Sequence, residues 1–292
     1  MSNDERISLN TGAMMPMEGF GVYLVTDERE CEESVYSAIK TGYRLIDTAA
    51  IYKNETFVGK AVSRAVNDGL CKREDLFITS KLWVQDMKDE DSAIYGVENS
   101  LKALGLDYID LYLEHQAAND YFSAWRGMEK AYKEGLLKNI GVSNFYPNML
   151  ANFCEVVEVV PAVNQIELHP WYTQEEALEN MKYYGVIPQA WAPLGGSRYD
   201  IQNNGLLNRI SQKHNKTAGQ VILRWNVQRG VSVIPKSTHI SRIEENFDIW
   251  DFELSSVEME EISSLDMGYT GTRAKHLNPD YVRDLMKKKL HD

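Results

Sequence analysis

Four side chains that can hold or move a proton stand beside short apolar runs of the sequence. Asp47 ends one run and Lys81 ends a second, while His115 directly follows a third. Tyr52 stands five residues after Asp47, just before a segment that opens a helix. Charged and polar groups are costly in a protein core unless they meet partners. The sequence therefore predicts that these four side chains meet across a pocket.

The four residue types suit the transfer of a proton to a bound carbonyl compound. A phenol has a pKa near 10, so tyrosine alone is a poor proton donor at neutral pH. We expect Lys81 to lower the pKa of Tyr52, and Asp47 to keep Lys81 charged and oriented. His115 can hydrogen-bond a substrate carbonyl and position it, which leaves Tyr52 as the general acid. The alternatives are a satisfied core histidine and a purely structural Asp47–Lys81 ion pair.

Strands and helices alternate along the rest of the sequence, and glycines stop several of the helices. A hairpin is expected over residues 6–16. Strands are expected over residues 17–22, 44–48, 76–82, 108–114, 139–143, 161–167, 186–191 and 231–234. Helices are expected over residues 30–41, 55–67, 89–104, 121–134, 147–157, 174–184, 205–215, 217–228, 240–246 and 255–265, and from 279 onward.

This alternation predicts parallel βαβ units, and eight strands close as a (β/α)₈ TIM barrel. We expect one α/β domain over residues 1–292, with an N-terminal β-hairpin and a C-terminal tail over the barrel mouth. Functional residues of such barrels lie at the carboxyl ends of the strands. Because strand side chains alternate with period two, Asp47, Lys81 and His115 should all project into the mouth.

The amino-acid composition narrows the classes of molecule that the protein is expected to bind. The formal net charge is -12, which disfavours nucleic acid and anionic membrane surfaces. The three cysteines are far apart and form no CxxC pair, so we expect neither a disulfide framework nor a cysteine zinc site. No signal peptide or long uncharged run is present, and a cytoplasmic protein is expected. The segment Gly19-Phe20-Gly21 lacks the third glycine of a dinucleotide fingerprint, since Leu24 stands there.

The four residues and their surroundings resemble the aldo-keto reductase superfamily over nearly the whole chain, in order. The matching segments are Asp47-Thr48-Ala49, Tyr52-Lys53-Asn54-Glu55, Ser80-Lys81-Leu82-Trp83, Gly141-Val142-Ser143-Asn144-Phe145, Asn164-Gln165-Ile166-Glu167-Leu168-His169-Pro170 and Ile234-Pro235-Lys236-Ser237. The short loops and the segment 190–195 look most like microbial members, such as the 2,5-diketogluconate and glyoxal reductases. The resemblance implies NADPH bound across the barrel mouth, without a Rossmann fold and without metal.

The resemblance also implies which residues hold the cofactor. The nicotinamide amide would be held by Ser143, Asn144 and Gln165, with Trp191 stacked on the ring, although Trp191 could also be a core residue. Leu194 and Gly196 would lie in the short loop beside the pyrophosphate. Ala192 replaces a serine that is commoner at this position in the family. The 2′-phosphate would be held by Lys236, Ser237, Thr238 and Arg242, and the adenine by Glu245 and Asn246. Cations beside a helix N-terminus suit an anion, which favours NADP over NAD.

The expected substrate pocket departs from the family pattern. Its walls are expected to be Val22, Tyr23, Trp83, His115 and Gln116, with the tail near Tyr269. Gln116 replaces an aromatic residue, so the pocket should be more polar, and Glu114 faces away from His115, where burial would be costly.

We expect NADPH-dependent reduction of small aldehydes or ketones by a monomer. The alternatives are a catalytically idle barrel that binds NADPH as a sensor or regulatory subunit, and an aldolase that uses Lys81 as a Schiff-base amine.

Overall fold

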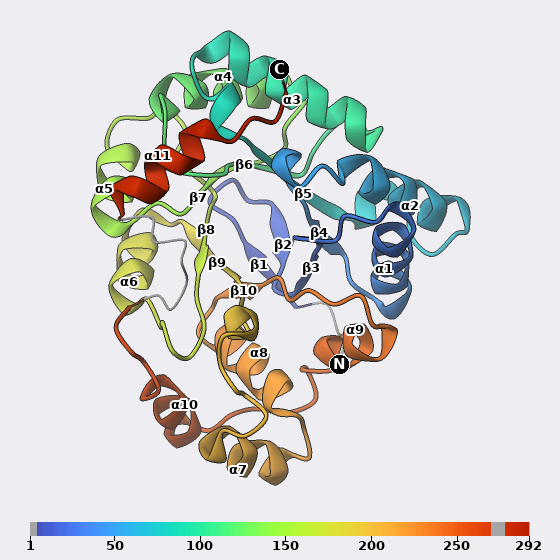
Figure 1. The fold of residues 1–292 in the computed structure, drawn as a ribbon, viewed down its shortest axis with the longest axis vertical. Helices are drawn as coiled ribbons and strands as arrows, with labels where there is room; N and C mark the ends of the chain where they lie inside the picture. Colours follow the sequence, from blue (N-terminus) through green and yellow to red (C-terminus); the bar gives the residue numbers. More distant parts are fainter. Residues whose placement is uncertain (1–4, 270–277, 292) are drawn as a thin grey trace.

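The computed structural model describes residues 5–269 and 278–291, and its main feature is a closed ring of parallel strands. The eight strands are paired in sequence order, and a bridge between Glu18 and Val233 joins the first to the last. Figure 1 shows the ring with the helices around its outside. The strands are β3 (Gly19–Gly21), β4 (Leu45–Asp47), β5 (Phe77–Leu82), β6 (Leu111–Glu114), β7 (Ile140–Ser143), β8 (Val163–Glu167), β9 (Ile187–Trp191) and β10 (Ser232–Val233).

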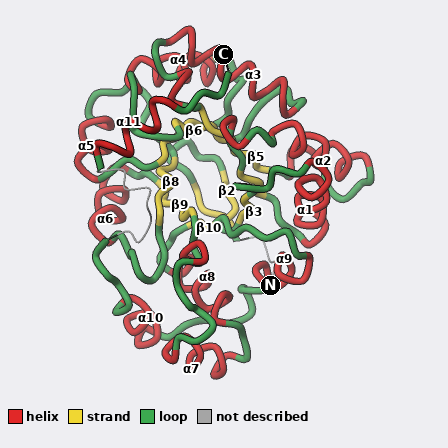
Figure 2. The backbone as a smooth tube through the Cα atoms, in the orientation of Figure 1, coloured by secondary structure: helices red, strands yellow, loops and turns green. Residues whose placement is uncertain are grey.

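The helices return the chain from the carboxyl end of each strand to the start of the next (Figure 2). Several begin at a side chain that accepts a backbone N–H of the first turn, such as Asp27, Asp89 and Asp120. They are α1 (Glu28–Thr41), α2 (Glu55–Asn67), α3 (Glu90–Leu104), α4 (Tyr121–Lys133), α5 (Pro147–Cys154), α6 (Glu175–Tyr184), α7 (Gly205–His214), α8 (Ala218–Gln228), α9 (Ile240–Phe247), α10 (Ser256–Ser263) and α11 (Pro279–Lys287).

Side-chain alternation along the strands divides the core into two layers. Leu45, Phe77 and Leu111 belong to the cluster inside the barrel. Ile46 and Ile78, one position further along, belong to the larger cluster between the strands and the helices. The same period places Asp47 above Leu45 on the inner side.

The N-terminal hairpin closes the opposite end of the barrel. It pairs β1 (Arg6–Ser8) with β2 (Met14–Pro16), and Leu9 and Met15 pack into the inner cluster. Thr11 donates to the side chain of Asn139, which directly precedes β7. Because this end is filled, the carboxyl ends of the strands form the open end of the barrel.

The predicted barrel and hairpin are confirmed, and most element bounds agree within three residues. The strand predicted over 108–114 begins only at Leu111, because Asp110 turns its carboxylate to Arg73 and to the backbone N–H of Ile78. Residues 278–291 run beside the turn η3 (Val84–Asp86), while the tail over 270–277 lies outside the described residues. The single-domain assignment stays a prediction. In the described parts of the chain, no helix has the length and apolar character needed to cross a membrane.

Candidate active site

A buried ion pair lies at the centre of the barrel mouth. Lys81 Nζ is 2.6 Å from Asp47 Oδ1, and the two side chains are 0% and 3% exposed. The ammonium also donates to the carbonyl of Thr48 at 2.8 Å. Burial raises the pKa of Asp47 and lowers that of Lys81, while their mutual attraction opposes both shifts. Burial thus disfavours the charged form of each group, and the short contact between them favours the ionised pair.

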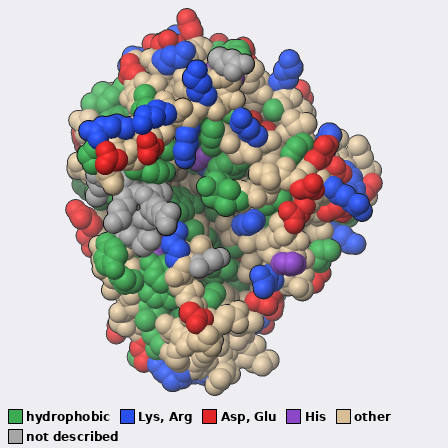
Figure 3. All heavy atoms as spheres, viewed as in Figure 1, with side chains coloured by type: hydrophobic (Ala, Val, Ile, Leu, Met, Phe, Trp, Pro, Cys, Tyr) green, Lys and Arg blue, Asp and Glu red, His purple; other side chains and the backbone are tan. Residues whose placement is uncertain are grey.

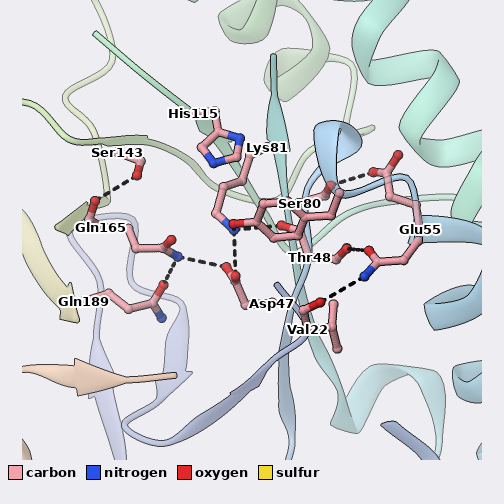
Figure 4. A network of polar contacts seen from close by, with 12 residues as sticks. Val22, Asp47, Thr48, Glu55, Ser80, Lys81, His115, Ser143, Gln165 and Gln189 are labelled. Carbon is pink, nitrogen blue, oxygen red and sulfur yellow. Dashed lines mark hydrogen bonds and ion pairs between the residues drawn. The ribbon is translucent and has the colours of Figure 1, made fainter. Parts of the chain in front are cut away.

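Tyr52 and His115 complete the predicted group of four. Tyr52 ends the short 3₁₀ turn η1 (Ala50–Tyr52), and its Oη lies 3.4 Å from Lys81 Nζ. The ring of His115 meets that of Tyr52 edge-on, with centroids 5.5 Å apart. Figure 4 shows Lys81 and His115 on one side of the Asp47 carboxylate. Residues from β4, β5 and the loop after β6 thus converge as the sequence predicted.

The lowered pKa that the sequence predicted for Tyr52 is not found, because other groups outweigh Lys81. Burial raises the pKa of Tyr52 well above its ordinary value, and the negative charge of Asp47 raises it further. The Lys81 ammonium lies against the Asp47 carboxylate, so its field at the phenol is largely cancelled. Tyr52 therefore keeps its proton throughout the neutral pH range. An alkoxide is far more basic than a phenolate, so this phenol can still protonate one.

Asn54 fixes the loop that carries Tyr52. Its side chain is fully buried, and its Nδ2 donates at 3.0 Å to the carbonyls of Val22 and Val25. Its Oδ1 accepts from Thr48 Oγ1 at 2.7 Å. One amide thus joins the loop after β3 to Thr48, the residue that follows β4. From the sequence, Asn54 was interpreted only as part of a segment that opens a helix.

The residues expected to hold the nicotinamide lie at the ends of β7, β8 and β9. Ser143 Oγ donates to the carbonyl of Gln165 at 2.8 Å. Asn144 Nδ2 donates to Ser143 Oγ and to the carbonyl of His115, while its Oδ1 accepts from the Trp191 indole at 2.9 Å. Asn144 holds a left-handed φ of 64°, a strain typical of functional sites. The mouth is thus lined by amide groups joined to one another.

The residues expected to hold the phosphates follow β9 and β10. Leu194 and Gly196 stand at the turn η4 (Gly195–Ser197), where Gly196 has a left-handed φ of 58°. Lys236 and Arg242 are exposed and flank the start of α9. In the part of the chain that the structure describes, neither cation has an ion-pair partner. In an acidic protein, two such cations beside a helix N-terminus fit a bound phosphate.

The remaining cofactor positions lie on the same segment. Ser237 Oγ accepts the backbone N–H of His239 at 3.1 Å, and Thr238 is half-buried between them. Glu245 accepts from Thr217 Oγ1 at 2.9 Å, so its carboxylate is turned toward α8. Asn246 is buried with 7% exposure. Ser237 and Thr238 thus precede α9, while Glu245 and Asn246 lie in its last turn.

The predicted pocket walls separate into side chains at the mouth and side chains behind it. The ring centroids of Trp83 and His115 are 5.3 Å apart, and those of Tyr23 and Tyr52 are 5.0 Å apart. Hydrophobic side chains gather near the middle of this face in Figure 3. Val22 is fully buried in the outer core, so it supports the wall from behind. Tyr269 is 55% exposed and directly precedes the residues outside the described range.

The C-terminal segment holds Trp83 in place. The Trp83 indole donates to the carbonyl of Lys288 at 2.8 Å. Gln85 accepts the backbone N–H of Leu290 at 2.6 Å and donates to the carbonyl of His291 at 2.8 Å. The described end of the tail is thus attached directly beside the pocket.

Two polar residues, one at the end of β6 and one just after it, have buried oxygen atoms without hydrogen bonds among the described residues. Gln116 is 7% exposed, and its Oε1 has no hydrogen-bond partner among the described residues. Glu114 is fully buried, and both its oxygens are likewise unpaired within the described chain. Burial raises the pKa of Glu114 well above its ordinary value, so it is held as a neutral acid, which reduces the cost of its burial.

Gln189 is a site residue that the sequence interpretation missed. Its Oε1 accepts from Gln165 Nε2 at 2.7 Å, and the same nitrogen donates to Asp47 Oδ2 at 2.8 Å (Figure 4). The available signal was its position two residues before Trp191, on the same side of β9. Among the described residues, no group of three or more His, Cys, Asp or Glu side chains is placed to hold a metal ion.

Comparisons with known proteins agree with this geometry. The model of the Aldo/keto reductase family matches residues 12–267. The glyoxal reductase of Bacillus subtilis is 46% identical over 263 residues, which cover 90% of this chain and 93% of that protein. The methylglyoxal reductase DkgA of Escherichia coli is 42% identical, over 96% of this chain and 98% of that protein. The crystal structure of a Bombyx mori aldo-keto reductase in complex with NADP superposes with a TM-score of 0.89 at 33% identity, covering 97% and 98% of the two chains.

Proposed function

The chain belongs to the aldo/keto reductase family, and from this premise we propose that it reduces glyoxal, methylglyoxal and related small carbonyl compounds. It is an NADP-dependent oxidoreductase that converts carbonyl groups to alcohols. Two similar bacterial proteins are named as reductases of these dicarbonyls. The narrower substrate class rests on that similarity and on the polar wall of the pocket.

We assign the proton transfer to Tyr52. When bound, the nicotinamide supplies a hydride to the carbonyl carbon, and the oxygen then needs one proton to become a hydroxyl. The observation that carries the assignment is the half-buried phenol, whose oxygen lies 3.4 Å from Lys81 Nζ and whose ring meets that of His115. His115 aims the carbonyl oxygen at the phenol. The Lys81 ammonium, held in place by Asp47, faces the phenol oxygen and opposes the cost of the negative charge that forms there.

The amide groups at the mouth are suited to hold the carboxamide of the cofactor. Asn144 uses both of its amide hydrogens within the protein, while among residues 5–269 and 278–291 its Oδ1 accepts only from Trp191. An amide oxygen has two lone pairs, so Asn144 can accept one further hydrogen bond. We propose that Ser143, Asn144 and Gln165 bind the carboxamide and that Trp191 stacks on the nicotinamide ring.

Gln116 supports the preference for dicarbonyl substrates. The buried Gln116 Oε1 has no hydrogen-bond partner among the described residues, which is costly, and a ligand donor that pairs with it recovers that cost. Gln116 Oε1 can accept from the hydroxyl of a dicarbonyl hydrated at its second carbonyl group. A purely apolar aldehyde has no such group, so it should be the poorer substrate.

The substrate proposal is tested by NADPH consumption with glyoxal, methylglyoxal and propanal. We expect kcat/KM for the two dicarbonyls to exceed that for propanal by about tenfold, the effect of one or two good hydrogen bonds. A higher value for propanal would contradict the polar pocket. NADPH binding without consumption on any of the three would indicate an idle binding barrel.

Changing Lys236 to Ala should weaken NADPH selectively. Charge-assisted hydrogen bonds to a phosphate contribute about 10- to 100-fold in affinity, so the NADPH Kd should rise by that factor. The Kd for NADH, which lacks the 2′-phosphate, should change less than about threefold. Quenching of tryptophan fluorescence measures both constants, and the control is Lys72→Ala, an exposed lysine on a different face. Equal losses for both cofactors would contradict the assignment of this site.

Location and assembly are also proposals. We propose a monomer that acts in the cytoplasm. The three cysteines are free thiols in the structure, which suits a reducing compartment. Gel filtration with light scattering tests the monomer.

A further inference from the structure

We propose that Gln189 is a positioning residue that aims the Gln165 amide at both Asp47 and the nicotinamide carboxamide. The inference rests on the proposed function, because it assigns Gln165 to the cofactor. It adds a residue that lies behind the mouth and touches neither cofactor nor substrate.

The contact between the two glutamines is built into the sheet. Gln165 on β8 and Gln189 on β9 are direct partners in the parallel register. The exposures of their side chains are 2% and 0%. Gln165 Nε2 lies 2.7 Å from Gln189 Oε1 and 2.8 Å from Asp47 Oδ2. Both hydrogens of the Gln165 amide are therefore used inside the barrel.

Two hydrogen-bond acceptors fix the orientation of an amide group, which a single acceptor does not. With a single hydrogen bond, the amide plane can rotate about the N–H direction. With acceptors for both hydrogens, the plane and the direction of the carbonyl oxygen are set together. Exchanging Oε1 and Nε2 of Gln165 would bring its oxygen against the Asp47 carboxylate and Gln189 Oε1, which is repulsive. The Gln165 oxygen therefore points away from both, as Figure 4 shows.

Gln189 is itself held by the neighbouring strand β10, where Ser232 is its direct partner in the register. Its Nε2 donates to Ser232 Oγ on β10 at 3.2 Å. A chain of hydrogen bonds thus crosses the interior from Asp47 on β4 to Ser232 on β10. Buried networks of this kind rigidify a site only when every member is hydrogen-bonded. Removing the Gln189 side chain should therefore loosen the orientation of the Gln165 amide.

The chain also acts on the proton donor. Asp47 accepts from Lys81 with Oδ1 and from Gln165 with Oδ2. The hydrogen bond from Gln165 lowers the pKa of Asp47 against the effect of burial. A Gln165 amide that is free to turn would supply this bond less often. Gln189 therefore influences cofactor binding and proton transfer through the same residue.

The test is Gln189→Met, which keeps the length of the side chain and removes the amide oxygen. We expect the NADP⁺ Kd, measured by tryptophan fluorescence, to rise about three- to tenfold, the size of one neutral hydrogen bond. We expect kcat to fall by a similar factor, and the acidic limb of the kcat–pH profile to move to higher pH. In a Gln165→Met background, Gln189→Met should have no further effect.

A conservative variant and a matched control separate positioning from general stability. Gln189→Glu keeps an acceptor that faces Gln165 Nε2, so its NADP⁺ Kd should stay within about twofold of wild type. Gln228→Met removes a glutamine that bonds only to Arg224 and Leu254, and it should lower stability without changing the Kd.

Three results would overturn the inference. The first is a wild-type NADP⁺ Kd and kcat for Gln189→Met. The second is that Gln189→Met changes Kd and kcat by the same factor in the wild-type and Gln165→Met backgrounds. The third is a tenfold higher NADP⁺ Kd for Gln189→Glu. The last of these applies even if the methionine variant does not fold. A Tyr52→Phe variant that kept its activity would instead overturn the proposed function.

Discussion

Changing Tyr52 to Phe should lower kcat for aldehyde reduction by about 10²- to 10⁴-fold, the range that a well-placed general acid contributes. The ring stays in contact with His115 and Tyr23, so the pocket should keep its shape. Only the hydroxyl group is lost, whose oxygen lies 3.4 Å from Lys81 Nζ. The NADP⁺ Kd, measured by fluorescence, should stay within about twofold of the wild-type value, because we assign the phenol no hydrogen bond to the cofactor.

Tyr112→Phe is the matched control for this change. Tyr112 is fully buried, and its hydroxyl bonds to Ser100 and to the carbonyl of Gly96, away from the mouth. Its loss should cost about 1 kcal/mol of stability and leave kcat unchanged. If Tyr52→Phe kept a wild-type kcat, another group would have to supply the proton.

Changing Lys81 to Met should impair both turnover and stability. Removing one partner of a buried ion pair leaves an uncompensated charge and costs about 3–5 kcal/mol. Lys81 is 0% exposed and supplies hydrogen bonds to Asp47 and Thr48. The cation that stabilises the forming phenolate is lost as well, so kcat should fall by about 10²-fold or more.

The loss of stability should depend on pH in a defined direction. Burial already raises the pKa of Asp47, and Lys81 is among the groups that oppose this shift. Without Lys81 the folded-state pKa rises further above the unfolded value, near 4. The folded variant then binds its proton more tightly, so its stability falls as pH rises above that value. Urea unfolding at several pH values should show the smallest deficit in acid.

Arg73→Met is the control for losing a cation. Arg73 pairs with Asp110 at 2.7 Å, just before β6, at the end of the strands away from the mouth. Its removal should lower stability while kcat stays close to wild type. A Lys81→Met variant with a wild-type kcat would show that the central pair is only structural.

Several features followed from the sequence because they depend on local pattern. Apolar runs alternating with helices predicted the eight-stranded barrel, and the period of two predicted that Asp47 and Lys81 share its inner side. The structure confirms the barrel and brings these residues within 2.6 Å of each other. The residue types at the ends of the strands predicted proton transfer to a carbonyl, and the resemblance to the aldo-keto reductases implied NADPH.

Other features needed the tertiary structure. The pKa of Tyr52 moves upward because burial and the Asp47 charge outweigh Lys81, and desolvation cannot be deduced from spacing. Gln189 reaches Gln165 only through the pairing of β8 with β9, and Asn54 reaches Val22 only through the fold of its loop.

The sequence by itself determined the fold through its periodicity, and the reaction through its residue types and its family motifs; it also supplied the proposal that Tyr52 is the proton donor. Only the tertiary structure decided how that donor is charged, aimed and held. Those properties arise from contacts between residues far apart in the chain, in an interior from which water is excluded.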